Sequence, residues 1–297
     1  MAELLQLVLS GLATGAVYAL VAAGFVLVWQ TSQTINFAQG EFVMLPAILV
    51  LMGTKVLGLP LGASFGLATL AFILMFGIGF KLVVVDPMIR HGVLPLAIAT
   101  MALSILMREG AKDAFSAEAH PFPSLVPQGT VSIGGAVLSL QDLAVLGVAL
   151  AMVAALQLFV AGTRTGRAMQ AAAQNPTVAR ILGVPVERMI LLTFAINAGL
   201  AAVASYLVSP VYLAKFSNGE VIGTAAFIAA IVGGFNQVRG AIAGGFLVGL
   251  ADNLAAGWLA AHGFSTAYRS AVPLVLLVLV VLVRPQGLFG RKEERTA

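Results

Sequence analysis

Long blocks of apolar residues alternate with short polar stretches along the whole chain. Apolar runs of roughly 20 residues are typical of membrane-spanning α-helices. The period-two alternation of a transmembrane β-barrel is absent, because whole windows are apolar on every side. The pattern predicts nine hydrophobic segments, at residues 4–28, 37–53, 60–80, 92–109, 139–162, 189–208, 221–235, 240–261 and 270–284. We therefore expect an all-α fold, a polytopic transmembrane helix bundle of about 8–9 spans, as a single domain over residues 1–297.

The composition agrees with this pattern and narrows the chemistry. Hydrophobic residues make up 60% of the chain and charged residues only 9%, with a mean hydropathy of +1.02. A soluble domain carries roughly 25% charged residues, so this chain has too little polar surface to face water. Because there is no Cys, disulfides and thiol chemistry are excluded. The three His residues lie far apart without ligand spacing, so we expect neither a metal site nor a cofactor.

The distribution of Lys and Arg predicts an orientation in the membrane. Most of them fall in the polar stretches 81–91, 163–188 and 284–297, which we assign to the cytoplasm because cytoplasmic loops are enriched in basic residues. The N-terminus is then outside and the C-terminus inside. An eight-span alternative, with segment 37–53 re-entrant, reverses the N-terminus and stays open. The net charge of +4 is small and scattered, which favours lipid headgroups and a juxtamembrane protein as partners over nucleic acid.

A short motif occurs twice. Phe37-Ala-Gln-Gly-Glu41 and Phe216-Ser-Asn-Gly-Glu220 share the pattern FxxGE, and each precedes a shorter apolar segment. The predicted topology puts the two copies on opposite sides of the membrane. That is the arrangement of an inverted repeat, which transporters use to build alternating access around a site at the midplane.

Candidate catalytic motifs are missing. There is no Ser/His/Asp set and no HExxH motif, and no Lys follows a Gly, so the chain has no Walker A loop and we expect no enzyme activity. If transport is ATP-driven, another polypeptide supplies the ATPase. Ionisable and amide groups in apolar segments are candidates for a substrate pathway, with a buried interhelical hydrogen bond as the alternative for Asp252. They are Asn36, Gln39, Glu41, Asn197, Asp252 and Asn253, and with them Asn218.

The stretch 163–188 is the one long polar interlude in the second half of the chain. Its residues predict two short helices. The second helix begins at Asn175-Pro176, with Asn175 as its N-cap and Pro176 in its first turn, and it ends at Gly183. A face of small residues, including Ala168 and Ala172, suits insertion into a partner's groove. The residues alone leave this reading and that of a linker helix lying on lipid headgroups equally open.

The same stretch resembles a known sequence. TGRAMQAAAQNPTVARILGV is similar to the cytoplasmic loop of the permeases of ABC importers for branched-chain amino acids, of the LivH type. GLATGAVYALVAAGFVLVWQTSQTINFAQGE resembles the first helix and following motif of that family, with Gln39 where His is common. AAIVGGFNQVRGAIAGGFLVGLADNL and VRPQGLFGR resemble its final regions. The likeness covers nearly the whole chain in order, apart from residues 110–138.

The resemblance implies a permease subunit in the bacterial inner membrane that moves branched-chain or other amino acids into the cytoplasm. It also implies four kinds of partner: a second permease in a heterodimer, two cytoplasmic ATPase subunits, a periplasmic or lipid-anchored substrate-binding protein, and membrane lipid. The loop would couple the ATPases to the helices through Gly166, Arg167, Ala168, Ala172, Asn175, Pro176, Leu182 and Gly183. An importer permease for urea or amides, and a self-sufficient secondary transporter or channel, are the alternatives.

Overall fold

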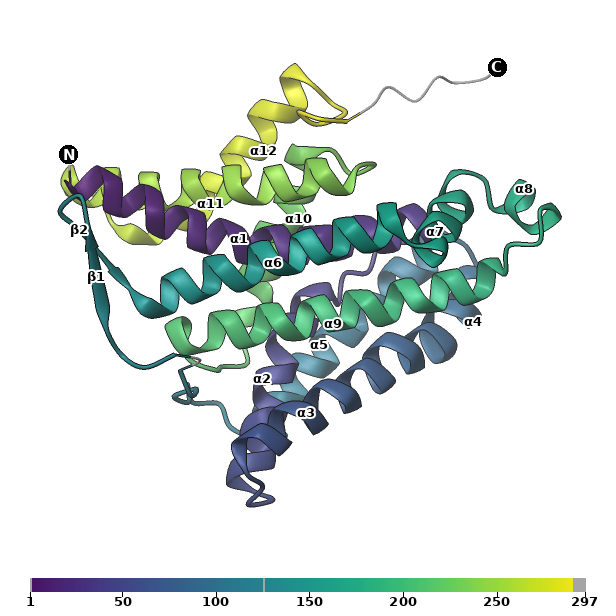
Figure 1. Ribbon diagram of the computed structural model, residues 1–297, viewed down its shortest axis with the longest axis horizontal. Helices are drawn as coiled ribbons and strands as arrows, with labels where there is room; N and C mark the ends of the chain where they lie inside the picture. Colours follow the sequence, from purple (N-terminus) through teal and green to yellow (C-terminus); the bar gives the residue numbers. More distant parts are fainter. Residues whose placement is uncertain (1, 125, 291–297) are drawn as a thin grey trace. The chain divides into compact units, whose positions relative to one another are not determined.

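The computed structural model describes residues 2–124 and 126–290. These residues are almost entirely helical, as the sequence predicts (Figure 1). The first half contains α1 (Ala2–Ser32), α2 (Gln39–Lys55), α3 (Leu61–Phe72), the π-helical segments η1 (Ile73–Gly79) and η2 (Lys81–Val85), α4 (Asp86–Ile89) and α5 (Val93–Ala114). After the strands β1 (Thr130–Ile133) and β2 (Ala136–Ser139) come α6 (Leu140–Gly162), α7 (Arg164–Gln174), α8 (Pro176–Ile181), α9 (Val186–Tyr212), α10 (Asn218–Gly233), α11 (Val238–Ala261), the 3₁₀ turn η3 (Thr266–Ser270) and α12 (Ala271–Val283).

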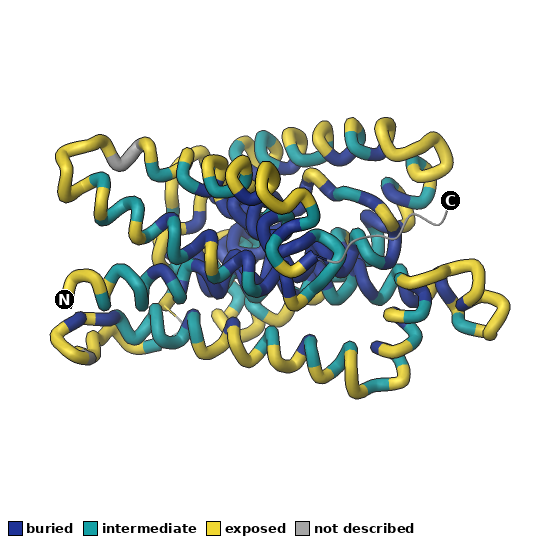
Figure 2. The backbone as a smooth tube through the Cα atoms, turned by 90° about the horizontal axis from the view of Figure 1, so that it is seen from above, coloured by how far each residue is buried: buried dark blue, intermediate teal, exposed yellow. Residues whose placement is uncertain are grey.

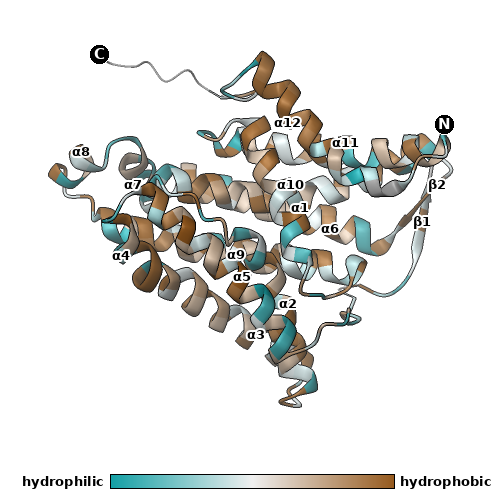
Figure 3. Ribbon diagram, turned by 180° about the vertical axis from the view of Figure 1, so that it is seen from behind, coloured by the Kyte–Doolittle hydropathy of each residue, from teal (hydrophilic) through white to brown (hydrophobic). Residues whose placement is uncertain are grey.

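Six helical stretches in the described part of the chain are long and apolar enough to cross a membrane. They are Ala2–Ser32, Leu61–Ile89, Val93–Ala114, Leu140–Gly162, Val186–Tyr212 and Val238–Ala261. Asn218–Gly233 and Tyr268–Val283 are apolar but shorter. Hydrophobic residues dominate most of these helices (Figure 3). The all-α membrane class is confirmed, whereas the number of spans and the side of each terminus stay predictions.

The chain divides into two compact units. The first unit contains residues 1–26, 124–150 and 224–297, and the second contains residues 27–123 and 151–223. Each is described below by itself, and the single transmembrane domain stays a prediction. The burial of each residue can be followed in Figure 2.

In the first unit, α1 and α11 pack through glycines. A Cβ on Gly15 would lie 2.9 Å from the Cα of Phe246, and one on Gly249 would overlap the backbone of Gly15. Small residues let helix backbones approach closely, which yields dispersion contacts where lipid supplies no hydrophobic drive. The same unit contains the antiparallel hairpin β1–β2, which turns at Gly134 and Gly135, both at positive φ.

In the second unit, α9 packs against α2 and against the π-helical segment η1. Phe42 of α2 lies at the centre of an aromatic cluster. Its ring meets those of Phe72, Phe76 and Phe80 edge-on at centroid distances of 5.4–5.7 Å. Edge-to-face pairs add stabilisation beyond the area they bury. The cluster therefore ties the start of α2 to the π-helical stretch.

Two predicted loops differ from the structure. Residues 81–89 are helical and continue α3, so the predicted cytoplasmic loop 81–91 shrinks to a turn before Val93. The predicted external stretch 110–138 begins inside α5 and ends in the β1–β2 hairpin, which an all-α prediction omits. The predicted cytoplasmic stretch 284–297 extends past Gly290, and residues 291–297 lie outside the described residues.

Candidate functional site

The two FxxGE motifs adopt the same local turn. In the first, the backbone N–H of Gln39 donates to the carbonyl of Asn36, and in the second that of Asn218 donates to Lys215, both at 3.2 Å. A helix begins two residues after each motif Phe, α2 at Gln39 and α10 at Asn218. The repeat seen in the sequence is therefore also a repeat of backbone conformation.

The two motifs meet within the second unit. A Cβ on Gly40 would overlap the carbonyl oxygen of Gly219 and lie 3.2 Å from the Cα of Gly223, so the three glycine backbones touch. The prediction that the copies lie on opposite sides of the membrane is therefore wrong. Two backbones in contact lie at the same depth in the membrane. The Lys/Arg bias could not reveal this, because it assigns loops to a side of the membrane and does not position the first residues of short helices.

Glu41 lies at this contact. It is 2% exposed, and Ser104 Oγ donates to its Oε1 at 3.2 Å. Its other oxygen, Oε2, lies against Gly219, where a Cβ atom would be if this residue had a side chain. Oε2 has no hydrogen-bond partner among the described residues. A buried carboxylate with one hydroxyl donor is a costly arrangement in an apolar bundle.

Gln39 and Asn197 form a closed amide pair beside it. Gln39 Nε2 donates to Asn197 Oδ1 at 2.7 Å, and Asn197 Nδ2 donates back to Gln39 Oε1 at 2.8 Å. Both side chains are fully buried. Asn36 is also buried, and its Oδ1 accepts from the Ala38 backbone at 3.0 Å. Four of the predicted pathway residues thus gather around the first motif.

Asn218 of the second motif is buried too, and its Nδ2 donates to the Leu213 carbonyl at 2.6 Å. This bond fixes the turn before α10. Asn218 therefore has a structural role that the sequence did not indicate.

A polar row on α5 faces both motifs, and the candidate residues predicted from the sequence do not include it. Thr100 Oγ1 accepts from the Phe37 backbone at 3.2 Å, Ser104 contacts Glu41, and Arg108 Nη1 lies 2.7 Å from Glu220 Oε2. The three positions are four residues apart, which puts them on one face of a helix. That spacing of polar residues in an apolar helix was the available signal.

Asp252 and Asn253 belong to the first unit. Asp252 is 5% exposed and accepts two hydrogen bonds from Arg269, from Nε at 2.8 Å and from Nη2 at 2.7 Å. Tyr18 Oη adds a longer contact at 3.5 Å. Asn253 Nδ2 donates to the Gly249 carbonyl of its own helix at 3.0 Å. The geometry favours the alternative of a buried bond between elements over a pathway carboxylate at Asp252.

The polar interlude 163–188 folds as predicted. Asn175 Oδ1 accepts from the Val178 backbone at 3.0 Å and caps α8, with Pro176 in its first turn. Thr163 caps α7 in the same way, by accepting from the Gly166 backbone at 2.9 Å. Gly183 has a φ of 82°, a region that favours glycine, and ends the second helix. These local signals are independent of tertiary packing, which is why sequence predicts them.

The alanine face of this helix pair is only partly exposed. Ala172 is 1% exposed and packs with Met169, Ala179 and Val186 in one apolar cluster, against which Ala168 also packs. Ala172 therefore contacts the chain itself, whereas Ala168, Ala171 and Ala173 stay partly exposed, and insertion of this face into a partner stays a prediction. The exposed apolar side chains are Val178 at 48%, Ile181 at 79% and Leu182 at 76%.

An ionic cluster connects this helix pair to the π-helical segment. Lys81 is buried in η2 and its Nζ lies 2.9 Å from Asp86 Oδ2 and 3.5 Å from Glu187 Oε2. The other oxygen of Glu187 lies 2.8 Å from Arg180 Nη2 of α8. Glu187 thus bridges a buried cation and an exposed one.

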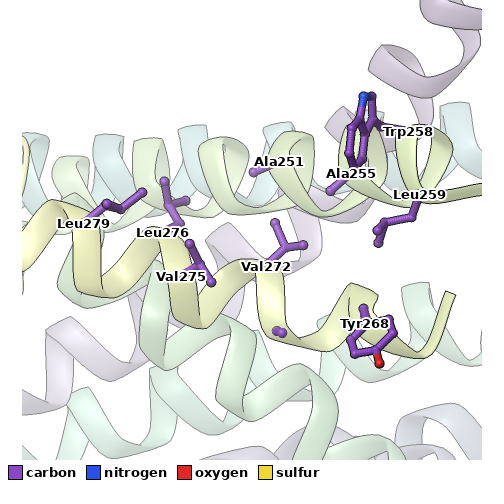
Figure 4. A pocket seen from close by; sticks show the side chains of 10 residues that line it. Ala251, Ala255, Trp258, Leu259, Tyr268, Val272, Val275, Leu276 and Leu279 are labelled. Atoms are coloured by element: carbon purple, nitrogen blue, oxygen red, sulfur yellow. The ribbon is translucent and has the colours of Figure 1, made fainter. Parts of the chain in front are cut away.

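An apolar groove lies between α11 and α12 in the first unit (Figure 4). Its lining is almost entirely apolar and includes Trp258, Val272, Leu276 and Leu279. It offers no convergent polar groups to orient a hydrophilic solute. The meeting point of the two motifs is therefore the stronger candidate for a solute site.

Six long apolar helical stretches in the described part of the chain indicate a multi-pass membrane protein. The chain belongs to the family described as branched-chain amino acid transport system / permease component, and its match spans residues 7–281. This confirms the family resemblance seen in the sequence, and makes the chain a component of a transport system with partner subunits.

Relatives in two bacteria match over nearly their full length. The chain is 33% identical, over 304 aligned positions, to the high-affinity branched-chain amino acid transport system permease protein BraD of Pseudomonas aeruginosa, covering 97% of this chain and 96% of that protein. It is 32% identical over 309 positions to LivH of Escherichia coli, with the same coverage. In fold, it is similar to a chain of PsaBC from Streptococcus pneumoniae in complex with Fab, with a TM-score of 0.51 at 12% identity over 96% of this chain and 93% of that one.

Proposed function

We propose that this chain is a membrane permease subunit of an ATP-driven ABC importer that moves branched-chain or other amino acids into the cytoplasm. The two relatives described above are named as permeases of high-affinity branched-chain amino acid transport systems, which supports the substrate class. The chain has no Gly-Lys pair, so ATP hydrolysis belongs to partner subunits. The importer would sit in the bacterial inner membrane with the C-terminus of this chain in the cytoplasm.

The observation that carries the proposal is the exposed apolar tip of α8. Val178, Ile181 and Leu182 are accessible on a helix whose ends are fixed by Asn175 and Gly183. Large apolar side chains exposed together at the end of a rigid element are typical of a docking surface. We assign this surface to a cytoplasmic ATPase subunit, with Arg167 at the exposed side of α7.

The remaining partners follow from the same proposal. A second permease would complete a heterodimer, two ATPases would dock from the cytoplasm, and a periplasmic or lipid-anchored binding protein would deliver the amino acid. In the cycle, closure of the ATPases would move residues 163–188 and open the contact between the two FxxGE motifs.

Reconstituted vesicles test the proposal. The complete complex should take up an amino acid only when ATP is present on the side of the membrane that bears the ATPase subunits. Arg167→Glu or Gly183→Trp should lower uptake per ATP hydrolysed while leaving membrane insertion intact. Uptake by this chain in vesicles that lack any ATPase subunit would contradict the importer and favour a self-sufficient transporter. Uptake of urea or acetamide in preference to amino acids would keep the importer and change its substrate.

A further inference from the structure

Among the described residues, Glu41 is the acid of the two FxxGE motifs that forms no ion pair, and Arg108 attracts it only from a longer distance. The second motif's acid, Glu220, is 65% exposed in its side chain and pairs with Arg108 at 2.7 Å. The neighbouring cation on α5, Lys112, pairs with Glu109 at 3.1 Å. Glu41 receives only the Ser104 hydroxyl, although it is almost completely buried.

The free oxygen of Glu41 points at the contact between the motifs. Oε2 lies against Gly219, next to the carbonyl of Gly40, and a Cβ on Gly219 would overlap both. The two helices α2 and α10 touch here through the backbones of Gly40, Gly219 and Gly223. Such a contact can separate without unpacking large apolar groups, and separation would expose Oε2.

The polar groups around Glu41 Oε2 favour a cation as ligand. A carboxylate with a free oxygen, the Gly40 carbonyl beside it and a hydroxyl from Ser104 are all hydrogen-bond acceptors or can act as acceptors. A primary ammonium group carries three donors and a positive charge, so it satisfies this set. Apolar replacement would be the stable solution if the position served packing alone, since intramembrane charges are expensive.

We propose that Glu41 Oε2 binds the ammonium group of a zwitterionic amino acid when the contact between Gly40 and Gly219 opens during translocation. The inference rests on the proposed importer function and names the group that the chain itself recognises. The amino termini of α2 and α10 meet at the same place, and helix amino termini favour a carboxylate, the other charged group of that solute.

Thiol chemistry provides a readout that is separate from transport. The chain has no Cys, so Ser104→Cys introduces a single target of nearly the same shape beside Glu41. The purified complex in lipid nanodiscs is labelled with two thiol reagents, cationic aminoethyl methanethiosulfonate and anionic sulfonatoethyl methanethiosulfonate. Labelling is done without nucleotide and with ATP, and mass spectrometry of this chain gives the rate for each reagent. We expect the cation-to-anion rate ratio to fall by about tenfold in Ser104→Cys/Glu41→Gln. The control, Ser104→Cys/Glu118→Gln, removes an exposed carboxylate outside α5 and should keep the ratio.

Protection identifies the ligand. L-Leucine, at the concentration that saturates uptake by the wild-type complex, should slow labelling of Ser104→Cys, whereas 4-methyl-2-oxopentanoate, which has the same carbon skeleton without the ammonium group, should not. In vesicles, Glu41→Gln should reduce uptake by about tenfold, and Glu41→Asp should retain more of it.

Three results would overturn the inference: a rate ratio that Glu41→Gln leaves unchanged, absence of labelling in both nucleotide states, or equal protection by the two compounds. A wild-type complex with ATP-driven uptake and any of these results refutes the Glu41 site alone. A wild-type chain that transports without an ATPase refutes the importer, whatever Glu41 does.

Discussion

Lys81 Nζ lies 3.5 Å from Glu187 Oε2, and this ion pair joins the π-helical segment η2 to the first turn of α9. The same carboxylate holds Arg180 of α8 through its other oxygen. π-Helical turns inside longer helices are frequent at functional sites. Phe80 directly precedes η2, and its ring contacts Phe42, the sequence neighbour of Glu41. A continuous set of contacts within the second unit therefore leads from α8 to the FxxGE motif.

We predict that Glu187→Gln uncouples ATP hydrolysis from transport. The amide keeps the shape but removes the charge that both Lys81 and Arg180 contact, so amino-acid uptake per ATP should fall by roughly tenfold. The melting temperature of the purified subunit should change little, because the Arg180 pair is exposed and such pairs contribute about 0–1 kcal/mol, while Lys81 keeps Asp86.

The control for this prediction is Glu109→Gln. Glu109 is an acid beside two cations, Arg108 and Lys112, but it lies on α5 and contacts neither Lys81 nor Arg180 in the described ion pairs. Its variant should leave the ratio of uptake to hydrolysis near that of wild type. An equal loss in both variants, or none in Glu187→Gln, would show that the cluster does not transmit movement.

Gly219→Ala should disturb the contact between the motifs. The added methyl group would overlap Glu41 Oε2 and the Gly40 backbone, and overpacking of this kind costs about 1–3 kcal/mol. We expect a lower melting temperature and a loss of uptake. Gly66→Ala is the matched control, since a Cβ there meets nothing within 4 Å and alanine favours a helix by about 1 kcal/mol. Thermal unfolding of the two purified variants in detergent measures their melting temperatures. An unchanged melting temperature in Gly219→Ala would contradict the close packing of Gly219 against Gly40 and Glu41.

The sequence predicts what depends on local chemistry. Asn175-Pro176 and Gly183 carry their conformation in their own residues, so the caps and the end of α8 could be placed before the structure was known. Gly134-Gly135 is an equally local hairpin signal, but together with Pro121, Pro123 and Pro127 before it the sequence predicts an irregular loop there.

What the sequence could not supply is contact between distant elements. The FxxGE motifs are visible in the chain, but their meeting at Gly40 and Gly219 depends on how α2 and α10 start within the fold. The same holds for Glu41 and Ser104, which lie 63 positions apart. Their pairing is decided by helix packing, which residue spacing within a single helix does not encode.

The two faces of the 163–188 helix pair should respond differently to substitution. Ile181→Ser should weaken binding of the ATPase subunit without changing the melting temperature, because Ile181 is 79% exposed and touches little of its own chain. Ala172→Leu should lower the melting temperature, because Ala172 is 1% exposed and an enlarged side chain there costs about 1–3 kcal/mol. Co-purification with the ATPase and thermal unfolding separate the effects. A loss of binding confined to folded Ala172→Leu would assign the docking surface to the alanine face instead.

Substitutions in the Asp252–Arg269 pair should distinguish a structural ion pair from a pathway carboxylate. Arg269→Met removes both donors from a carboxylate that is 5% exposed, and breaking a buried pair in this way costs about 3–5 kcal/mol. The melting temperature should therefore fall sharply. Asp252→Asn/Arg269→Met removes both charges, so it should recover most of the stability and retain amino-acid uptake. Recovered stability without uptake would contradict this assignment and return Asp252 to the pathway, since the charge itself would then be required for transport.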